Sequence, residues 1–200
     1  MKKVSLLCCA LLIVATAAFG DSLTAADRER GEKYLEQTRD GIVAATKGLS
    51  PAQFNFKPAP DRWSIAEVLE HITLAEDFIL QNITTKIMQA PAGAADRDTA
   101  KIDAAVVAMV PDRSHKAQAP GPLVPTGRWT PAATLDHFLS SRAKTMAYLE
   151  STPDLREHVA DSPLKQPLDG YEWLLFLSAH SERHTKQILE VKADPNFPKN

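Results

Sequence analysis

Apolar residues recur every three to four positions along most of this chain, which is the spacing of helices with one buried face. A Thr-x-x-Asp start at Thr24, followed by apolar residues among charges, predicts a first helix over about 24–48. The same spacing is clearer after Ser64-Ile-Ala-Glu67, which has the form of a capping box. This segment predicts a second helix over about 64–89.

The second half of the chain predicts two more long helices. Thr130 precedes a proline, which suits the first helical position, and a third helix is expected over about 130–152. Asp169-Gly-Tyr-Glu172 is a further capping box, and the helix after it is expected to run to about Val191.

The connections between these helices differ in regularity. The Pro-rich stretch 51–63 is expected to be irregular, and a short helix near 99–110 is followed by a Pro- and Gly-rich stretch, 111–129. No internal repeat or strand pattern appears. The expected fold class is all-α, a four-helix bundle with a long crossover between the second and third helices.

The first twenty residues differ from the rest of the chain. Lys2 and Lys3 precede an uncharged apolar run that ends in small residues before Asp21. The run is shorter than the roughly 20 apolar residues that cross a membrane, so it predicts a cleaved signal peptide at 1–20. The expected mature domain, 21–200, is secreted or periplasmic, with no stable membrane insertion after cleavage. A retained anchor is the alternative.

Composition narrows the classes of function. The 200 residues, 44% hydrophobic, suit one domain with a sizeable core. Cys8 and Cys9 both lie in the leader, so the mature domain would have no disulfide, no thiolate nucleophile and no cysteine metal ligand. Loss of the two leader lysines takes the formal net charge from −2 to −4, which argues against a nucleic-acid partner.

Three histidines fall on apolar faces of two predicted helices. His180 and His184 are four apart, so they rise about 6 Å along the axis over slightly more than one turn, and both rings can reach one ion. Packed helices lie about 8–10 Å apart, so His71 on the second helix could complete a three-nitrogen site. Alternatively, His71 bonds a backbone carbonyl or Glu67, and the other two are partly exposed. Periodicity leaves both interpretations open.

Two segments carry a family resemblance. WSIAEVLEHI, residues 63–72, and GYEWLLFLSAHSERHTKQI, residues 170–188, resemble the DinB-like superfamily of metal-binding four-helix bundles, and the resemblance spans nearly the whole mature chain. It implies that His71, His180 and His184 are the metal ligands, with water or substrate at the remaining positions. Members bind divalent ions such as zinc, nickel or manganese, so the identity of the metal stays open. A three-histidine site with an open position is typical of catalytic metal centres.

The resemblance is compatible with two reactions and one noncatalytic role. Some members are thiol-dependent transferases or isomerases, but export takes this chain away from the cytosolic thiols that such enzymes use. Hydrolysis by metal-activated water suits an exported protein, with Glu67 and Glu76 as candidate proton carriers. The third hypothesis is a noncatalytic module that holds metal or a small ligand. The small-molecule substrate and the catalytic residues stay unassigned.

Other large or charged side chains on the helices are expected to be structural. A substrate pocket could be covered by three aromatic residues, Trp63, Trp173 and Phe176. Aromatic residues at helix ends are more often part of the core. Arg183, beside a candidate ligand, is expected to pair with a carboxylate on a neighbouring helix rather than with a substrate anion.

The remaining histidines are not expected to bind the ion. The residues around His137 do not indicate whether it lies on the buried or the exposed side of the third helix. His115 and His158 fall in polar connectors that are expected to be exposed to solvent. The first helix or the 91–129 connection could bury a homodimer interface, but an amphipathic pattern does not distinguish a partner from the core.

Overall fold

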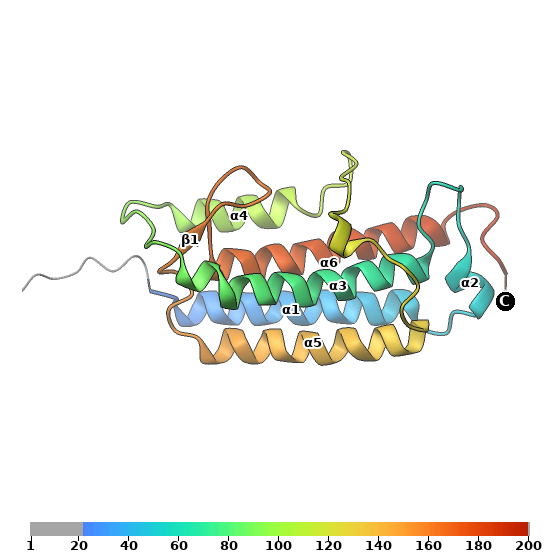
Figure 1. Ribbon diagram of the computed structural model, residues 1–200, viewed down its shortest axis with the longest axis horizontal. Helices are drawn as coiled ribbons and strands as arrows, with labels where there is room; N and C mark the ends of the chain where they lie inside the picture. Colours follow the sequence, from blue (N-terminus) through green and yellow to red (C-terminus); the bar gives the residue numbers. More distant parts are fainter. Residues whose placement is uncertain (1–21, 200) are drawn as a thin grey trace, which may run out of the picture.

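The structure, a computed structural model, describes residues 22–199 as four long helices that lie side by side, with shorter elements around them (Figure 1). The long helices are α1 (Ala25–Thr46), α3 (Ile65–Thr85), α5 (Pro131–Ser151) and α6 (Gly170–Lys192). The predicted helical fold is confirmed. The signal peptide predicted for 1–20 lies outside the described residues. Within 22–199, no helix is long and apolar enough to cross a membrane.

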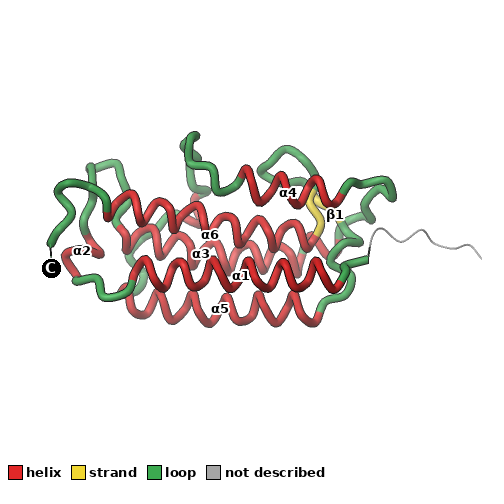
Figure 2. The backbone as a smooth tube through the Cα atoms, turned by 180° about the vertical axis from the view of Figure 1, so that it is seen from behind, coloured by secondary structure: helices red, strands yellow, loops and turns green. Residues whose placement is uncertain are grey.

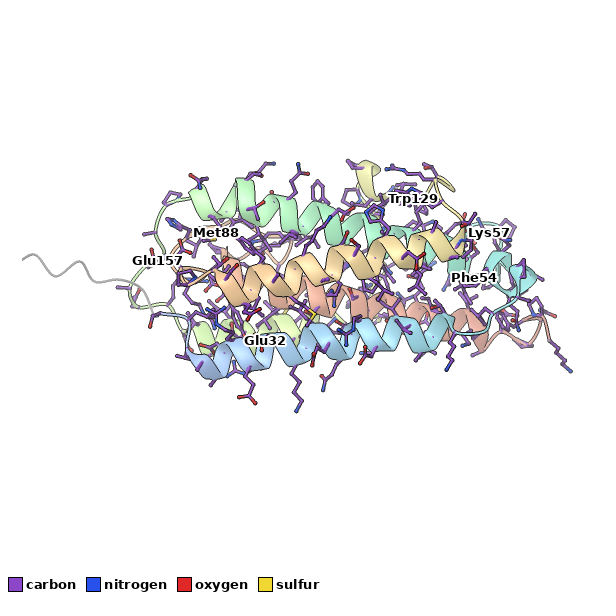
Figure 3. The ribbon with its side chains drawn as sticks, turned by 90° about the horizontal axis from the view of Figure 1, so that it is seen from below. Glu32, Phe54, Lys57, Met88, Trp129 and Glu157 are labelled. Carbon is purple, nitrogen blue, oxygen red and sulfur yellow. The ribbon has the colours of Figure 1, made fainter. Side chains whose placement is uncertain are left out.

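The packing of the long helices brings α3 against α6. Helix α3 also contacts α5, while α1 contacts both α5 and α6. Helices α3 and α6 run in opposite directions (Figure 1). A shorter helix, α4 (Thr99–Met109), lies outside the four and packs against α6 (Figure 2). Phe54 and Lys57 mark one end of the bundle, and Met88 and Glu157 mark the other (Figure 3).

Both helices that carry the three histidines begin at a capping box, as predicted. The Ser64 hydroxyl accepts the Glu67 N–H at 3.2 Å, and the Glu67 carboxylate accepts the Ser64 N–H at 2.7 Å. At the start of α6, the corresponding bonds between Asp169 and Glu172 are both 2.7 Å. These reciprocal bonds satisfy backbone donors that the first turn leaves free, so they fix where each helix begins.

The structure differs from the helix prediction in one boundary and in one additional short helix. Helix α3 ends at Thr85, and a separate 3₁₀ turn, η1 (Ile87–Gln89), follows it, because Lys86 leaves the helical conformation with φ −125°. The apolar spacing continues through this turn, which is why periodicity alone extended the helix to 89. The stretch expected to be irregular contains a one-turn helix, α2 (Pro51–Asn55), capped by Ser50. Its proline occupies the first turn, where proline is tolerated.

A short hairpin also departs from the all-helical prediction. Strands β1 (Val159–Ala160) and β2 (Leu168–Asp169) pair antiparallel, with Val159 opposite Asp169. Strands of two residues are too short to leave an alternating pattern in the sequence. A second 3₁₀ turn, η2 (Gly121–Leu123), lies in the long connection between α4 and α5.

The apolar core consists of two clusters along the bundle. The first cluster contains apolar side chains mainly of α3, α4 and α6, together with side chains of the loops near the start of α6. The second cluster contains apolar side chains of α1, α3 and α5 and of the last turns of α6. Representative buried members are Ile83, Val106, Leu155 and Leu177 in the first cluster and Ile42, Leu69, Phe138 and Ile188 in the second. Burial of such side chains contributes roughly 1.5–3 kcal/mol each, before conformational entropy is subtracted.

A buried ion pair crosses the centre of the bundle. Arg142 of α5 donates from Nε and Nη2 to the two carboxylate oxygens of Glu76 on α3, at 2.8 and 2.7 Å. Its remaining N–H groups reach the Leu35 carbonyl at 2.8 Å, the Thr38 hydroxyl at 2.7 Å and the Ser181 hydroxyl at 2.9 Å. One side chain therefore joins all four long helices.

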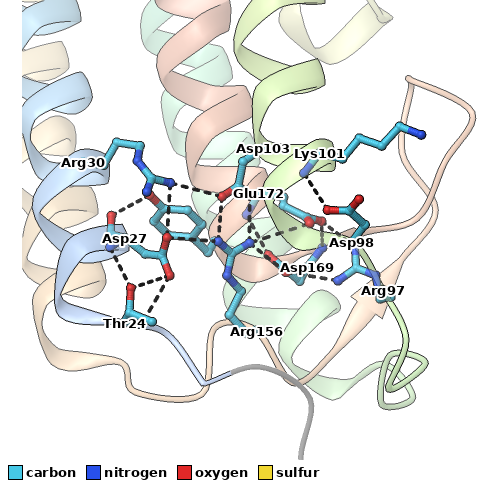
Figure 4. A network of polar contacts seen from close by, with 11 residues as sticks. Thr24, Asp27, Arg30, Arg97, Asp98, Lys101, Asp103, Arg156, Asp169 and Glu172 are labelled. Atoms are coloured by element: carbon cyan, nitrogen blue, oxygen red, sulfur yellow. Dashed lines mark hydrogen bonds and ion pairs between the residues drawn. The ribbon is translucent and has the colours of Figure 1, made fainter.

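A second charged network holds the start of α6 (Figure 4). Arg156 pairs with Asp103 of α4 at 2.7 Å and with Asp169 at 3.1 Å. Arg97 pairs with Glu172 at 2.6 Å and also with Asp169 at 3.1 Å. The three carboxylates and Arg156 are buried, so few of these charges are screened by water.

This network predicts a loss of stability as pH rises from acid to neutral. Burial, and then the negative charge of Asp169, raise the pKa of Glu172 to about 7. Because this is above the ordinary value of a glutamate, the protonated form stabilises the fold at low pH, and that stability is lost as pH rises through about 7. The free energy of unfolding is expected to fall as pH rises from about 4.5, the ordinary value of a glutamate, to about 7, by at most about 1.4 kcal/mol per pH unit for one proton.

Chemical denaturation at both pH values tests this expectation, with Glu172→Gln as the matched variant. The amide keeps an acceptor for the Asp169 N–H but does not ionise, so the decline should be smaller in the variant. An equal decline in both proteins would assign the pH dependence to other groups.

Candidate metal centre

Three histidine rings converge between α3 and α6. His71 comes from α3, and His180 and His184 lie one turn apart on α6. One ring nitrogen of each lies within 4.8 Å of the corresponding atoms of the other two. The Nε2 atoms of His71 and His180 are 3.3 Å apart. The predicted ligands are therefore brought together from segments more than a hundred residues apart in the chain.

The histidines are largely shielded from water. His71 is 3% exposed and His184 is 9% exposed, while His180 is half-buried. Burial lowers the pKa of His71, and burial followed by the charge of His71 lowers that of His184 to about 3. Burial and the two neighbouring imidazoles also lower the pKa of His180. At neutral pH all three rings are neutral, which is the form that binds metal ions.

The outward nitrogens of two rings already have hydrogen-bond acceptors. Nδ1 of His71 lies 2.8 Å from the Leu123 carbonyl oxygen in η2, and Nδ1 of His184 lies 2.8 Å from Oε1 of Gln187. An acceptor at Nδ1 places the proton there, so the lone pair is on Nε2. This is how proteins orient histidine ligands of metals, and the residues present fit a divalent ion.

Aromatic rings border the centre. The ring of Trp63 lies 4.9 Å from that of His71, and Phe176 stacks on His180 with 6.4 Å between centroids. Trp173, which is buried, contacts Phe176 at 5.3 Å. The three aromatics pack against the core as expected, but Trp63 and Phe176 also border the histidines.

The two glutamates considered as proton carriers have other partners. The Glu67 carboxylate caps α3 through Ser64 and bonds Nζ of Lys57 at 2.9 Å. Glu76 is 1% exposed and belongs to the buried pair with Arg142. Both carboxylates are therefore held by structural contacts.

The remaining histidines lie apart from the centre. His137 bonds Asp77 at 2.8 Å and packs against Trp129. His115 is exposed, as expected. His158, which was also expected to be exposed, is half-buried, and its Nδ1 lies 2.6 Å from the Ala90 carbonyl oxygen. The residue fell in a polar stretch, but the short hairpin orders that stretch.

Sequence reasoning missed the role of residues 110–128, which follow α4 and lie along α3 and α6. Arg183 does not pair with a carboxylate of a neighbouring helix: its guanidinium donates to the backbone carbonyls of Val110, Asp112 and His115. Arg113 from this segment reaches α6, where it forms a two-pronged ion pair with Glu190 at 2.6 and 2.7 Å.

The far end of the segment is fixed by Glu70, the neighbour of His71. The Glu70 side chain is buried and accepts the backbone N–H groups of Thr126 at 3.0 Å and Gly127 at 2.8 Å. Gly127 has φ +72°, a conformation that favours glycine. The Pro- and Gly-rich composition indicated a loop, but no local pattern indicates which carboxylate binds it.

Comparisons with known proteins agree with the helical fold. The family model of the DinB superfamily matches residues 34–188. YuaE of Bacillus subtilis strain 168, an uncharacterized protein, is 27% identical over 148 residues, which cover 73% of this chain and 87% of YuaE. The solved structure of YfiT from Bacillus subtilis, described as a probable metal-dependent hydrolase with an unusual four-helix bundle topology, matches with a TM-score of 0.56 and 14% identity. The match covers 89% of this chain and 93% of YfiT. This likeness shows the fold.

Proposed function

Because the chain belongs to the DinB superfamily, we propose that it binds one divalent metal ion through His71, His180 and His184 and uses that ion in hydrolysis. The observation that carries the proposal is the convergence of the three rings while two of their outward nitrogens are held by acceptors. Zinc, nickel and manganese are the candidate ions. The description of YfiT as a probable metal-dependent hydrolase supports the reaction class.

The chain's own residues account for the binding step. Leu123 and Gln187 hold the protons of His71 and His184 on the outward nitrogens, so both rings offer a lone pair. Trp63 and Phe176 border the rings and restrict water around them. When bound, a divalent ion supplies Lewis acidity that activates a small nucleophile and polarises the bond to be broken. Three protein ligands leave a position for substrate, as in catalytic sites.

The proposal places this chemistry outside the cytosol. The leader predicted at 1–20 supports a secreted or periplasmic domain. Water is available in that setting, whereas small cytosolic thiols are not a dependable cosubstrate there. Hydrolysis of a small molecule is therefore favoured over thiol transfer.

Activity of the reconstituted protein tests the reaction. The mature chain, stripped of metal and reloaded with zinc, nickel or manganese, is assayed on carboxylic esters, amides and phosphate esters, and on thiol-plus-electrophile pairs. We expect hydrolysis that requires added metal and is absent from folded His184→Ala. Turnover only with the thiol pairs would replace hydrolase by transferase. Metal-loaded protein inactive on every class would indicate a noncatalytic binding module.

A further inference from the structure

A row of polar side chains continues from the histidines toward the end of α6. His184, Gln187 and Glu190 follow one another at intervals of three residues, so they lie along one side of the helix. Arg113, from the segment after α4, contacts two of them. Its Nη1 lies 3.3 Å from Oε1 of Gln187, and its Nε and Nη2 bond the two oxygens of Glu190.

The chemistry of these groups determines which way the Gln187 amide points. A guanidinium has only donors, whereas a side-chain amide has an acceptor oxygen at one position and a donor nitrogen at the other. Arg113 therefore favours the orientation in which Oε1 of Gln187 faces it, since the reverse would place N–H groups against N–H groups. The same Oε1 lies 2.8 Å from Nδ1 of His184. An oxygen there requires the proton of His184 to be on Nδ1.

We propose that Arg113 positions His184 through Gln187: the guanidinium fixes the amide, and the amide fixes the tautomer of the imidazole. The lone pair of His184 is then on Nε2, toward His71 and His180. The benefit for metal affinity rests on the proposed function, but the tautomer itself does not. Arg113 and Gln187 are positioning residues, because neither provides one of the three converging nitrogens.

Glu190 makes Arg113 suited to this role. The two-pronged pair holds the planar guanidinium in one orientation, and it leaves Nη1 directed at Gln187. The Arg113 side chain is 19% exposed, so most of it is shielded from water. The hydrogen bond from Arg113 also lowers the pKa of Glu190, which keeps its carboxylate charged.

Comparison with His71 shows why the acceptor of His184 needs a second residue to fix its orientation. The acceptor of His71 is the Leu123 backbone carbonyl, which can only accept and cannot exchange places with a donor. The acceptor of His184 is a side-chain amide, which presents either function after a half-turn. A second group is needed to fix the amide, and Arg113 is the donor that contacts it.

The tautomer of His184 can be measured without metal. Nitrogen NMR of the imidazole rings at neutral pH reports which nitrogen is protonated. The wild type is expected to show a single tautomer of His184 with the proton on Nδ1. Arg113→Met should give a mixture, because the amide can then turn either way. Arg113→Met combined with Gln187→Glu should restore the Nδ1–H form, since a carboxylate presents acceptors in both orientations.

Arg62→Met is the matched control. Arg62 also pairs with Glu190, at 3.8 Å, but the structure gives it no hydrogen bond to Gln187, so its loss should leave the tautomer unchanged. If Arg113→Met retains a single Nδ1–H tautomer, the proposal is overturned. Thermal melts by circular dichroism identify the folded variants. If Arg113→Met does not fold, Gln187→Leu tests the same step, because it removes the acceptor and should lose the single tautomer.

Cobalt binding provides a second readout. Removal of the acceptor by Gln187→Leu is expected to weaken Co²⁺ binding roughly 10–100-fold, as for other groups that orient metal ligands. Arg113→Met should reduce the Co²⁺ affinity to a share of the wild-type value equal to the fraction of His184 that keeps the Nδ1–H tautomer, because only that tautomer offers Nε2 to the ion. Unchanged affinity in Gln187→Leu would contradict the role of the amide. A wild type that binds neither Co²⁺ nor zinc, nickel or manganese would refute the proposed function, while the NMR comparison would still decide the role of Arg113.

Discussion

His71→Ala is expected to abolish the stabilisation of this protein by divalent metal. The substitution removes the only converging nitrogen that α3 contributes, so an ion could no longer bridge α3 and α6. With zinc at about 100 times the dissociation constant, the wild type should gain about 2.7 kcal/mol in its free energy of unfolding. The variant should gain almost nothing. Denaturation of each protein with zinc and with a chelator measures the gain separately from any cost of the substitution itself.

His137→Ala provides the control for this measurement. It also removes a histidine from a long helix of the bundle, but His137 bonds Asp77 and lies outside the cluster of three. The zinc-induced gain should persist in this variant. A gain of the same size in His71→Ala would mean that zinc binds somewhere else on the chain.

Arg142→Leu is expected to be the most destabilising single change in the core. It leaves the Glu76 carboxylate, which is 1% exposed, without its cation, and it removes the hydrogen bonds that join α5 to the other long helices. Breaking a buried ion pair by removing one partner costs roughly 3–5 kcal/mol. Equilibrium denaturation in urea measures this loss, which is a large part of the stability of a typical domain.

A double substitution separates the charge from the packing. Arg142→Leu combined with Glu76→Leu removes both charges, so it should be more stable than Arg142→Leu alone. Lys186→Ala, which breaks an exposed pair with Glu182 on α6, should cost at most about 0.5 kcal/mol. If the double variant is as unstable as the single one, the loss comes from packing rather than from the unpaired carboxylate.

The long helices could be predicted because the sequence features that mark them, the capping boxes and the apolar spacing, lie within each helix. The capping boxes at Ser64 and Asp169 and the apolar spacing after them place two helix starts where the structure has them. The spacing of His180 and His184 is likewise fixed within one helix. Periodicity left the approach of His71 open, because the distance between two helices depends on their packing.

What the sequence could not predict depends on contacts between distant segments. Residues 110–128 are rich in proline and glycine, and their path is set by side chains of α3 and α6, such as Glu70 and Arg183. The contact between Arg113 and Gln187 joins residues 74 positions apart and leaves no periodic signal. The orientation of the three histidine rings was therefore beyond sequence reasoning, although the choice of these histidines as candidate ligands was not.

The metal content of the purified protein shows whether the three histidines bind an ion. The mature protein, purified without added metal or chelator, is analysed by elemental mass spectrometry beside His71→Ala and His184→Ala. We expect close to one zinc, nickel or manganese ion per chain in the wild type and a near-complete loss in both variants. A wild type without metal, which also takes up none of these ions and melts at the same temperature in their presence, would contradict the metal centre. Its three histidines would then be packing residues.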